Sequence, residues 1–121
     1  MSWNYEQASG KLQQIGTTLQ FLGYSGAGAG KNNPDKQDVK NVGPVPKGVY
    51  TINAPVDTKT HGPFVLPLVP HPDNAMFGRS GFLIHGDSVV NPGTASEGCI
   101  IVNRPAREVI WQSKDRVLIV T

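Results

Sequence analysis

Short apolar runs separated by turn residues make up most of this 121-residue chain. Three of them, WNYEQ, KLQQI and TLQFLGY, lie within residues 1–24, and the turn ASG separates the first two. Their partial alternation of polar and apolar residues predicts a small antiparallel β meander. Residues 25–41 (SGAGAGKNNPDKQDVKN) have no periodic apolar face and predict a long surface loop. Loops of this length are often functional, so this one either borders a groove or is a mobile decoration.

Residues 42–121 continue the pattern of short strands. In GPVPKGVYTI, prolines and a glycine precede a β-branched and aromatic run, which predicts a strand from about Val49. GPFVLPLV predicts a strand that is bent or lies at a sheet edge, because Pro67 has no amide hydrogen to donate. GFLIH is short and continuously apolar, which is typical of a central strand buried on both faces. This strand would place His85 at the edge of the core.

Only one helix is expected, close to the C-terminus. Pro105 suits a first helical turn, and several residues after it share one face at helical spacing, which predicts a helix over about residues 105–113. RVLIVT then predicts a final strand. The 14 Gly, 10 Pro, 38% hydrophobic and 17% charged residues agree with many turns between short strands. We therefore expect one mainly β domain over residues 1–121.

Charge and hydropathy exclude several classes of function. The net charge of +2 comes from scattered residues, with no run of Lys or Arg that could follow a phosphate backbone, so nucleic acid is not an expected partner. No apolar window approaches the roughly 18 residues of a membrane span. The N-terminal MSWNYEQASGK has neither the basic nor the apolar region of a signal peptide. The protein is therefore expected either to stay inside the cell or to be exported by a secretion system other than the general secretion pathway.

The single cysteine, Cys99, follows a turn-rich loop that begins after His85. A thiol is mostly protonated at neutral pH, and a nearby imidazole can accept its proton and later return it to a leaving amine. Cys99 is thus a candidate nucleophile and His85 its candidate base. The alternatives are an inert core cysteine, common among free cysteines, and a hydrogen-bonded structural histidine. The TASEG loop before the cysteine favours the catalytic interpretation.

The residues just before Cys99 could shape its surroundings. Gly98 lacks a Cβ, so a substrate carbonyl could approach the main chain there, and the Cys99 amide, with or without that of Gly98, could stabilise an oxyanion. Ser96 could orient His85 or its own loop by a hydrogen bond, and the alternative is an ordinary turn serine before Glu-Gly. Glu97 would oppose thiolate formation unless it points away, so we expect it to face solvent, with substrate contact as the alternative.

Other polar residues are weaker candidates. Arg79 could grip a substrate carboxylate with two hydrogen bonds, and the alternative is an ordinary surface arginine. His61 and His71 lie in turn sequences and are expected in exposed loops. His85, Asp87 and Glu97 lack the spacing of a dependable metal site, so neither a metal nor another cofactor is expected.

Two motifs resemble those of a known family. IHGDS followed by SEGCI resembles the signature of YkuD-type L,D-transpeptidases, in which a histidine precedes a Ser/Thr-His-Gly-Cys box, and GPVPKGVYTI resembles their Pro-x-Gly-x-aromatic-x-Ile strand. With GYSG and MFGRSGFLIHGDS, almost the whole chain is similar to the branch delivered as antibacterial effectors by type VI secretion systems. Glu97 stands where the box has histidine, and Ile100 and Ile101 stand where an Arg or Asn is usual. The loop between His85 and the box is also shorter than in the broad family.

The resemblance implies a fold and a set of roles. The fold would be a β-sandwich or barrel, with the meander in residues 1–24, the loop in 25–41 and the catalytic core in 42–121. Cys99 would be the nucleophile and His85 the general base, while Ser96 and Gly98 would shape the box.

The resemblance also implies an activity and partners. The substrate would be a peptidoglycan stem tetrapeptide, which loses its terminal D-alanine to water or exchanges it for another amine. A type VI secretion system would deliver the protein to the periplasm of a target bacterium, so a secretion carrier and a periplasmic immunity protein are expected partners. Two alternatives stay open: a cysteine amidase or endopeptidase of the same polymer, and a non-catalytic module that binds cell wall or a partner.

Overall fold

The structure, a computed structural model, describes residues 2–121. Within that range the strands are β1 (Trp3–Tyr5), β2 (Lys11–Gln14), β3 (Gln20–Leu22), β4 (Tyr24–Ser25), β5 (Gly48–Ile52), β6 (Val56–Thr58), β7 (Gly62–Pro70), β8 (Leu83–His85), β9 (Ile100–Ile101) and β10 (Val117–Val120). The helices are two short 3-10 turns, η1 (Gly28–Gly30) and η2 (Pro34–Lys36), and the α-helix α1 (Arg104–Gln112). The expected mainly β fold with one short helix near the C-terminus is confirmed.

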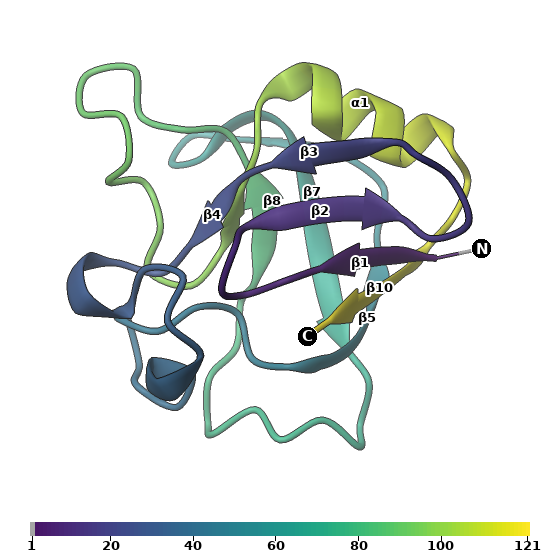
Figure 1. Cartoon of the computed structure of the whole chain (residues 1–121). Coiled ribbons are helices and arrows are strands. Elements are labelled where there is room, and N and C mark those ends of the chain that lie inside the picture. The colour runs from purple at the N-terminus through teal and green to yellow at the C-terminus, as the bar shows by residue number, and fades with distance from the viewer. Residues whose placement is uncertain (1) are drawn as a thin grey trace.

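The sheet closes on itself. Its strands pair in the order β3-β2-β1-β10-β5-β7-β8-β9-β4, with β6 on β7. β3 and β4 stand at opposite ends of this order, yet only Gly23 separates them along the chain, and Figure 1 shows one running into the other. The Gly23 amide donates to Gly10 O (2.8 Å). A Cβ at Gly23 would lie 2.2 Å from Ile101 O, so a glycine is needed where the two edges of the sheet meet.

The first three strands form the expected meander. β1 pairs antiparallel with β2, and β2 with β3. β1 also pairs in parallel with β10, so the two ends of the chain lie side by side in the sheet. The N-terminal meander is thereby joined to the rest of the sheet through the last strand.

Of the two predictions for the Pro67 strand, a bend or an edge position, the edge position is wrong. β7 is central: it pairs antiparallel with β5, β6 and β8 at successive stretches of its length. Asn53 N donates to Pro67 O (2.8 Å), and the return bond, which proline cannot make, would fall just after β5 ends at Ile52. The proline, which has no N–H to donate, therefore lies opposite the end of β5, where it interrupts no hydrogen bonds between the two strands.

The segment 25–41 is a long loop with internal structure. After Ser25 it contains η1 and η2, and the Asn33 side chain caps η2 by accepting from the Asp35 amide (3.1 Å). The Ala27 amide donates to Val42 O (2.8 Å), which anchors the start of the loop to its end. In Figure 1 the loop projects from the side of the molecule where β4 lies.

Helix α1 begins close to where the sequence predicts. The Asn103 side chain accepts from the Ala106 amide (3.0 Å), and Pro105 occupies the first turn. Ala106 and Ile110 are buried, and the helix packs against β7 and β8. The same helix buries Arg107, whose head group reaches the site described below.

The core fixes which way the neighbouring strands β8 and β9 face. It is formed mainly by large apolar side chains from the sheet and α1: Trp3, Tyr5, Leu12, Tyr50, Ile84, Ile100, Ile110 and Leu118. Ile84 and Ile100 are paired across β8 and β9 and both point into this core. Because side chains alternate along a strand, their neighbours His85 and Cys99 point to the opposite side.

Candidate active site

Two adjacent parallel strands bring the predicted nucleophile and base to one pocket. His85 pairs with Ile101 across β8 and β9, and Cys99 lies two residues earlier, on the same face. Cys99 and His85 both line a pocket of about 900 Å³. The pairing of β8 with β9 thus brings two residues that are distant in the sequence to the same pocket.

His85 is buried and held in one orientation. Its Nδ1 lies 2.8 Å from Gly86 O. A carbonyl can only accept, so Nδ1 carries the hydrogen and Nε2 keeps its lone pair. Burial is the main cause that lowers the pKa of His85, and the nearby His61 and Arg107 lower it further, against the hydrogen bond to Gly86. The neutral imidazole is therefore a base at neutral pH.

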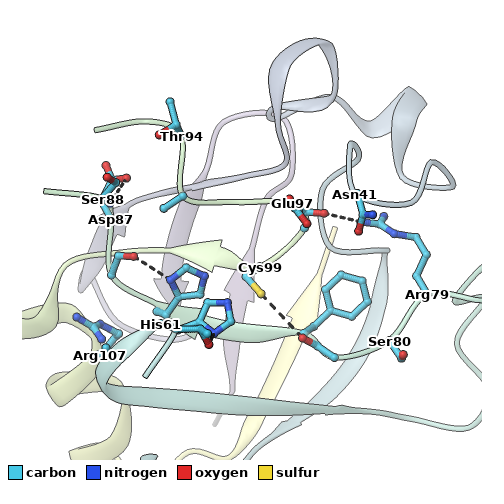
Figure 2. A pocket seen from close by; sticks show the side chains of 18 of the residues that line it. Asn41, His61, Arg79, Ser80, Asp87, Ser88, Thr94, Glu97, Cys99 and Arg107 are labelled. Atoms are coloured by element: carbon cyan, nitrogen blue, oxygen red, sulfur yellow. Dashed lines mark hydrogen bonds between the residues drawn. The ribbon is translucent and has the colours of Figure 1, made fainter. Parts of the chain in front are cut away.

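Cys99 is half-buried, and its sulfur lies at the pocket rather than in the core. Sγ is 4.0 Å from Gly81 O, and Figure 2 shows it directed toward that carbonyl. Burial raises the pKa of the thiol; the Leu83 amide and Arg79 oppose this, while the charge of Glu97 adds to it. The resting pair is therefore a protonated thiol beside a neutral imidazole.

Ser96 fixes the loop before the cysteine and does not contact His85. Its Oγ donates to Cys99 O (2.6 Å) and accepts from the amides of Gly26 (2.9 Å) and Gly98 (3.0 Å). One donor and two acceptors are all that a hydroxyl has, and Ser96 is buried, so its hydrogen-bonding capacity is fully used. Of the two roles considered for Ser96, orienting its own loop is the one that these contacts perform.

Gly98 is required both by its backbone angles and by its neighbours. Its φ of 145° is one that residues with a Cβ rarely adopt. A Cβ there would lie 2.5 Å from Arg79 Nη2 and 2.9 Å from Phe82. Its amide is already donated to Ser96, whereas no group in residues 2–121 accepts from the Cys99 amide. The Cys99 N–H is therefore the donor left for an oxyanion.

Arg79 is not a surface arginine. It is 6% exposed, and its terminal nitrogens donate to four backbone carbonyls: Nη1 to Gln37 O (2.6 Å) and Pro44 O (2.8 Å), and Nη2 to Gly43 O (2.9 Å) and Glu97 O (3.3 Å). Figure 2 shows the link to Glu97. These bonds tie the end of the long loop to the cysteine box. A two-bond grip on a substrate carboxylate stays a prediction, and it would require some of these bonds to break.

Glu97 is exposed and lines the pocket. Its carbonyl faces Arg79, while its carboxylate has no ion pair within residues 2–121. The expected solvent-facing position is what the structure shows, at a place where a substrate group could also reach it.

His61 belongs to the site although the sequence placed it only in a turn. It is exposed and lies between β6 and β7, and its ring centroid is 4.6 Å from that of His85, with the planes tilted by 55°. Figure 2 shows it beside Cys99. His71 is also exposed and does not line the pocket. His61 and His71 flank opposite ends of β7, and the pairing of β7 with β8 brings only His61 close to His85. No local pattern around His61 predicts this position.

One wall of the pocket is the loop after β8. Hydrogen bonds among Tyr24, Asp87, Ala95 and Gly93, called the latch below, hold this loop in place. Tyr24 OH donates to Asp87 Oδ1 (2.6 Å) and accepts from the Ala95 amide (3.0 Å), while Asp87 also accepts from the Gly93 amide (3.0 Å). Burial and the contact with Asp87 raise the pKa of Tyr24 to about 12. Lys31 Nζ donates to Gly93 O (3.0 Å). The sequence gives no local sign of this contact between residues far apart in the chain.

Within residues 2–121 no group of three or more His, Cys, Asp or Glu side chains could hold a metal ion. Also within that range, no helix has both the length and the apolar character needed to cross a membrane. The chemistry available in the pocket includes that of a thiol, two imidazoles, two guanidinium groups, an amine, carboxylates and main-chain amides.

Fold and site together define a small mainly β domain in which a histidine at the end of β8 and a cysteine just before β9 line a shared pocket. The Tlde1 domain matches residues 19–118, so the chain belongs to the Tlde1 family, whose name denotes type VI L,D-transpeptidase effectors. The effector-family resemblance of the sequence is thereby confirmed at the level of the family.

The fold is also similar to a solved structure. The "Structure of Bdellovibrio bacteriovorus Bd1075" superposes with a TM-score of 0.67 at 14% identity. The match covers 99% of this chain and 47% of that chain, so this chain spans about half the length of the protein it resembles. At this identity the likeness concerns the fold alone. None of the curated proteins compared with the chain matches it.

Proposed function

We propose that this domain catalyses cysteine-dependent acyl transfer on peptidoglycan stem tetrapeptides, as a type VI effector directed against other bacteria. One observation carries the proposal: His85 in β8 and Cys99, just before the adjacent strand β9, line the same pocket, with the imidazole neutral and its Nε2 free to accept. Membership of the Tlde1 family supports the substrate class and the route of delivery.

In the first half-reaction, His85 Nε2 takes the thiol proton of Cys99 as the sulfur attacks the carbonyl carbon at the L-centre of the diamino acid. The C–S bond forms, and the carbonyl oxygen gains a negative charge that the Cys99 amide stabilises. The tetrahedral species then breaks its C–N bond. D-Alanine leaves as its amine takes the proton from His85, and a thioester remains.

In the second half-reaction, His85 removes a proton from the incoming nucleophile as it attacks the thioester, and the thiolate of Cys99 leaves and regains that proton. Water as the nucleophile makes the enzyme an L,D-carboxypeptidase. A D-amino acid makes it an exchange enzyme, and the amine of a second stem makes it a transpeptidase. Glu97, exposed beside the thiol, is positioned to contact a cationic group of one of these substrates.

Loss of tetrapeptide donors would deprive a competitor of cross-links in its wall. Delivery by a secretion system requires a carrier component. A cell that makes the enzyme would need a periplasmic immunity protein, and a protein that covers the pocket would be sufficient. These partners follow from the proposed role.

The test is incubation of purified tetrapeptide muropeptides with the protein, with and without an added D-amino acid, followed by mass spectrometry. We expect loss or exchange of the terminal D-alanine, abolished in Cys99→Ala and His85→Ala and retained in His71→Ala, an exposed histidine outside the pocket. Cleavage within the L-Ala/D-Glu region would instead identify an amidase or endopeptidase. No covalent change in any muropeptide would point to a binding module.

A further inference from the structure

Arg107 presents an unused pair of N–H groups to the pocket. The side chain is 5% exposed, and Nη1 donates to Pro63 O and Phe64 O (2.9 Å each), with Nε near Asn103 O (3.5 Å). Within residues 2–121 no protein atom accepts from Nη2. Arg107 lines the pocket, and Figure 2 shows it on the far side of His61 from Cys99. Its head group is therefore fixed by two of its nitrogens and open at the third.

This guanidinium also lacks a carboxylate partner. The ion pair of α1 joins Arg104 to Glu108 (4.0 Å) and leaves Arg107 out. Burial lowers the pKa of Arg107, as does the charge of Arg104, and Glu108 opposes them only as a more distant charge. Buried charges in proteins are normally paired, because an unpaired one is costly to take out of water. An anion that entered the pocket would meet a cation that is already desolvated and oriented.

The space beside His85 is kept open for this group. A Cβ at Gly86 would lie 3.0 Å from Arg107 Nη2, and the φ of Gly86 is not in the positive range that favours glycine. Proximity to the guanidinium therefore accounts for glycine at this position. Gly86 is also the residue whose carbonyl orients His85. The open N–H groups of Arg107 thus lie on the histidine side of the pocket.

From this geometry, and resting on the proposed function, we infer that Arg107 Nη2 binds the terminal carboxylate of the amino acid that leaves. His85 must deliver its proton to the leaving amine, so the leaving group lies on the histidine side. In an α-amino acid the carboxylate is one carbon from that amine, which brings it to the same side. Arg79 cannot do this without giving up bonds, because its four terminal N–H groups are already donated.

The inference defines a substrate class: peptides whose scissile bond is followed by a single residue with a free carboxylate. The same subsite would receive the carboxylate of an incoming D-amino acid during exchange, because the acceptor amine must approach the thioester from the side that the leaving amine vacated. A guanidinium suits this task, since two parallel N–H groups match a carboxylate. Amides of the same amino acids would be poor substrates and poor acceptors.

The test compares a stem tetrapeptide that ends in D-alanine with the same peptide ending in D-alaninamide, for the wild type, Arg107→Gln and Arg107→Lys. Arg104→Gln, on the exposed side of the same helix, is the matched control. We expect the wild type and the control to prefer the free acid by about 10- to 100-fold in kcat/KM, the range of one hydrogen-bonded charge. The preference should fall below about threefold in Arg107→Gln, mainly through KM for the acid.

The outcomes distinguish failure of the carboxylate subsite from failure of the proposed acyl transfer. Equal turnover of acid and amide by the wild type overturns the carboxylate subsite and leaves acyl transfer standing. A full preference in a folded Arg107→Gln variant overturns the assignment to Arg107, whereas a preference partly kept in Arg107→Lys agrees with a cationic subsite. Turnover of neither peptide by the wild type removes the proposed function and this inference with it.

Arg107 also supports the carbonyls of Pro63 and Phe64, so its variants could lose stability. A measurement on the wild-type protein tests the subsite without any loss of stability. The side-chain NMR resonances of Arg107 should shift on saturation with D-alanine and remain in place with D-alaninamide. No shift with D-alanine, or the same shift with both, would refute the subsite.

Discussion

At the scale of single residues, the candidate site combines a protonated thiol with a neutral imidazole. The pKa of His85 is lowered and that of Cys99 is raised, in both cases chiefly by burial, so both groups are neutral before substrate arrives. Charge separation would then develop only as the sulfur attacks, next to the free Cys99 amide. This differs from cysteine enzymes in which a low thiol pKa gives a standing thiolate.

Alkylation of Cys99 by iodoacetamide should reveal this resting state. Because the thiolate is the reactive form and its pKa is raised, we expect the rate in the native protein to keep climbing above about pH 8.5. In urea, the rise should occur at lower pH, near the usual value of a free thiol. A native rate that is already independent of pH between about 5.5 and 7.5 would show a thiolate–imidazolium pair instead.

Replacement of Gly98 by alanine should be among the most damaging single changes in the domain. The variant combines an unfavourable φ with a Cβ placed 2.5 Å from Arg79 Nη2. Gly78→Ala is the matched control, since Gly78 also has a positive φ (70°) and a Cβ added there would meet nothing within 4 Å.

For Gly78→Ala we expect a loss of about 1 kcal/mol in the free energy of unfolding, from backbone strain alone. Gly98→Ala should lose about 2–3 kcal/mol more, because the buried Arg79 must give up hydrogen bonds to carbonyls. Urea denaturation of both variants measures the difference. Equal losses would mean that the contact with Arg79 adds nothing.

At the scale of elements, side chains from one loop set the position of another. Tyr24 at the start of β4 joins Asp87 and Ala95, which belong to opposite ends of the pocket wall. The wall also exposes Val89 and Val90 almost completely, so apolar packing does little to hold it. The order of this loop therefore depends on polar contacts at its base.

Tyr24→Phe should loosen this loop while preserving the sheet. The change deletes the bonds to Asp87 Oδ1 and the Ala95 amide and keeps the ring beneath Lys31. Hydrogen exchange should become faster at the amides of Gly93 and Ala95 and stay unchanged in β5 and β7. Unaltered exchange at those two amides would show that the latch does not order the wall.

The sequence predicts the elements well where a local signal exists. Asn103 and Pro105 mark the start of α1, and the alternation of residues 3–14 marks β1 and β2. It fails where the cause is a partner elsewhere in the chain. Pro67 indicates an edge strand by the local rule, but β7 lies in the centre because β5 ends where the proline lacks its donor.

At the scale of the whole molecule, the site is a product of topology. The parallel pairing of β8 with β9 sets Cys99 beside His85, and closure of the sheet at Gly23 brings Tyr24 and Ser25 against the cysteine loop. The sequence could name Cys99 and His85 as candidates from their residue types, and their catalytic roles stay a prediction. The environments of Arg79 and Arg107 could not be predicted, because their partners are backbone carbonyls, which every residue carries.

Burial of a neutral histidine at the centre of this topology should make the global stability depend on pH. The pKa of His85 is lower in the folded protein than in the unfolded chain, so the unfolded chain binds more protons on the acidic side of about pH 6.5. The free energy of unfolding should then fall as pH decreases below about 6.5, by up to about 1.4 kcal/mol per pH unit, until the folded histidine also protonates.

Urea denaturation between about pH 7.5 and 5.5 measures this slope. His85→Gln should remove most of it, because the amide has no proton to bind in this range. His71→Ala should retain it, since that ring is exposed and lies outside the pocket. His61 and Arg107 face His85 and contribute to its lowered pKa, so Arg107→Gln should reduce the slope without abolishing it. A wild-type stability that is flat over this range would mean that the pKa of His85 is the same in the folded and the unfolded protein, so that burial does not favour the neutral imidazole that the proposed base requires.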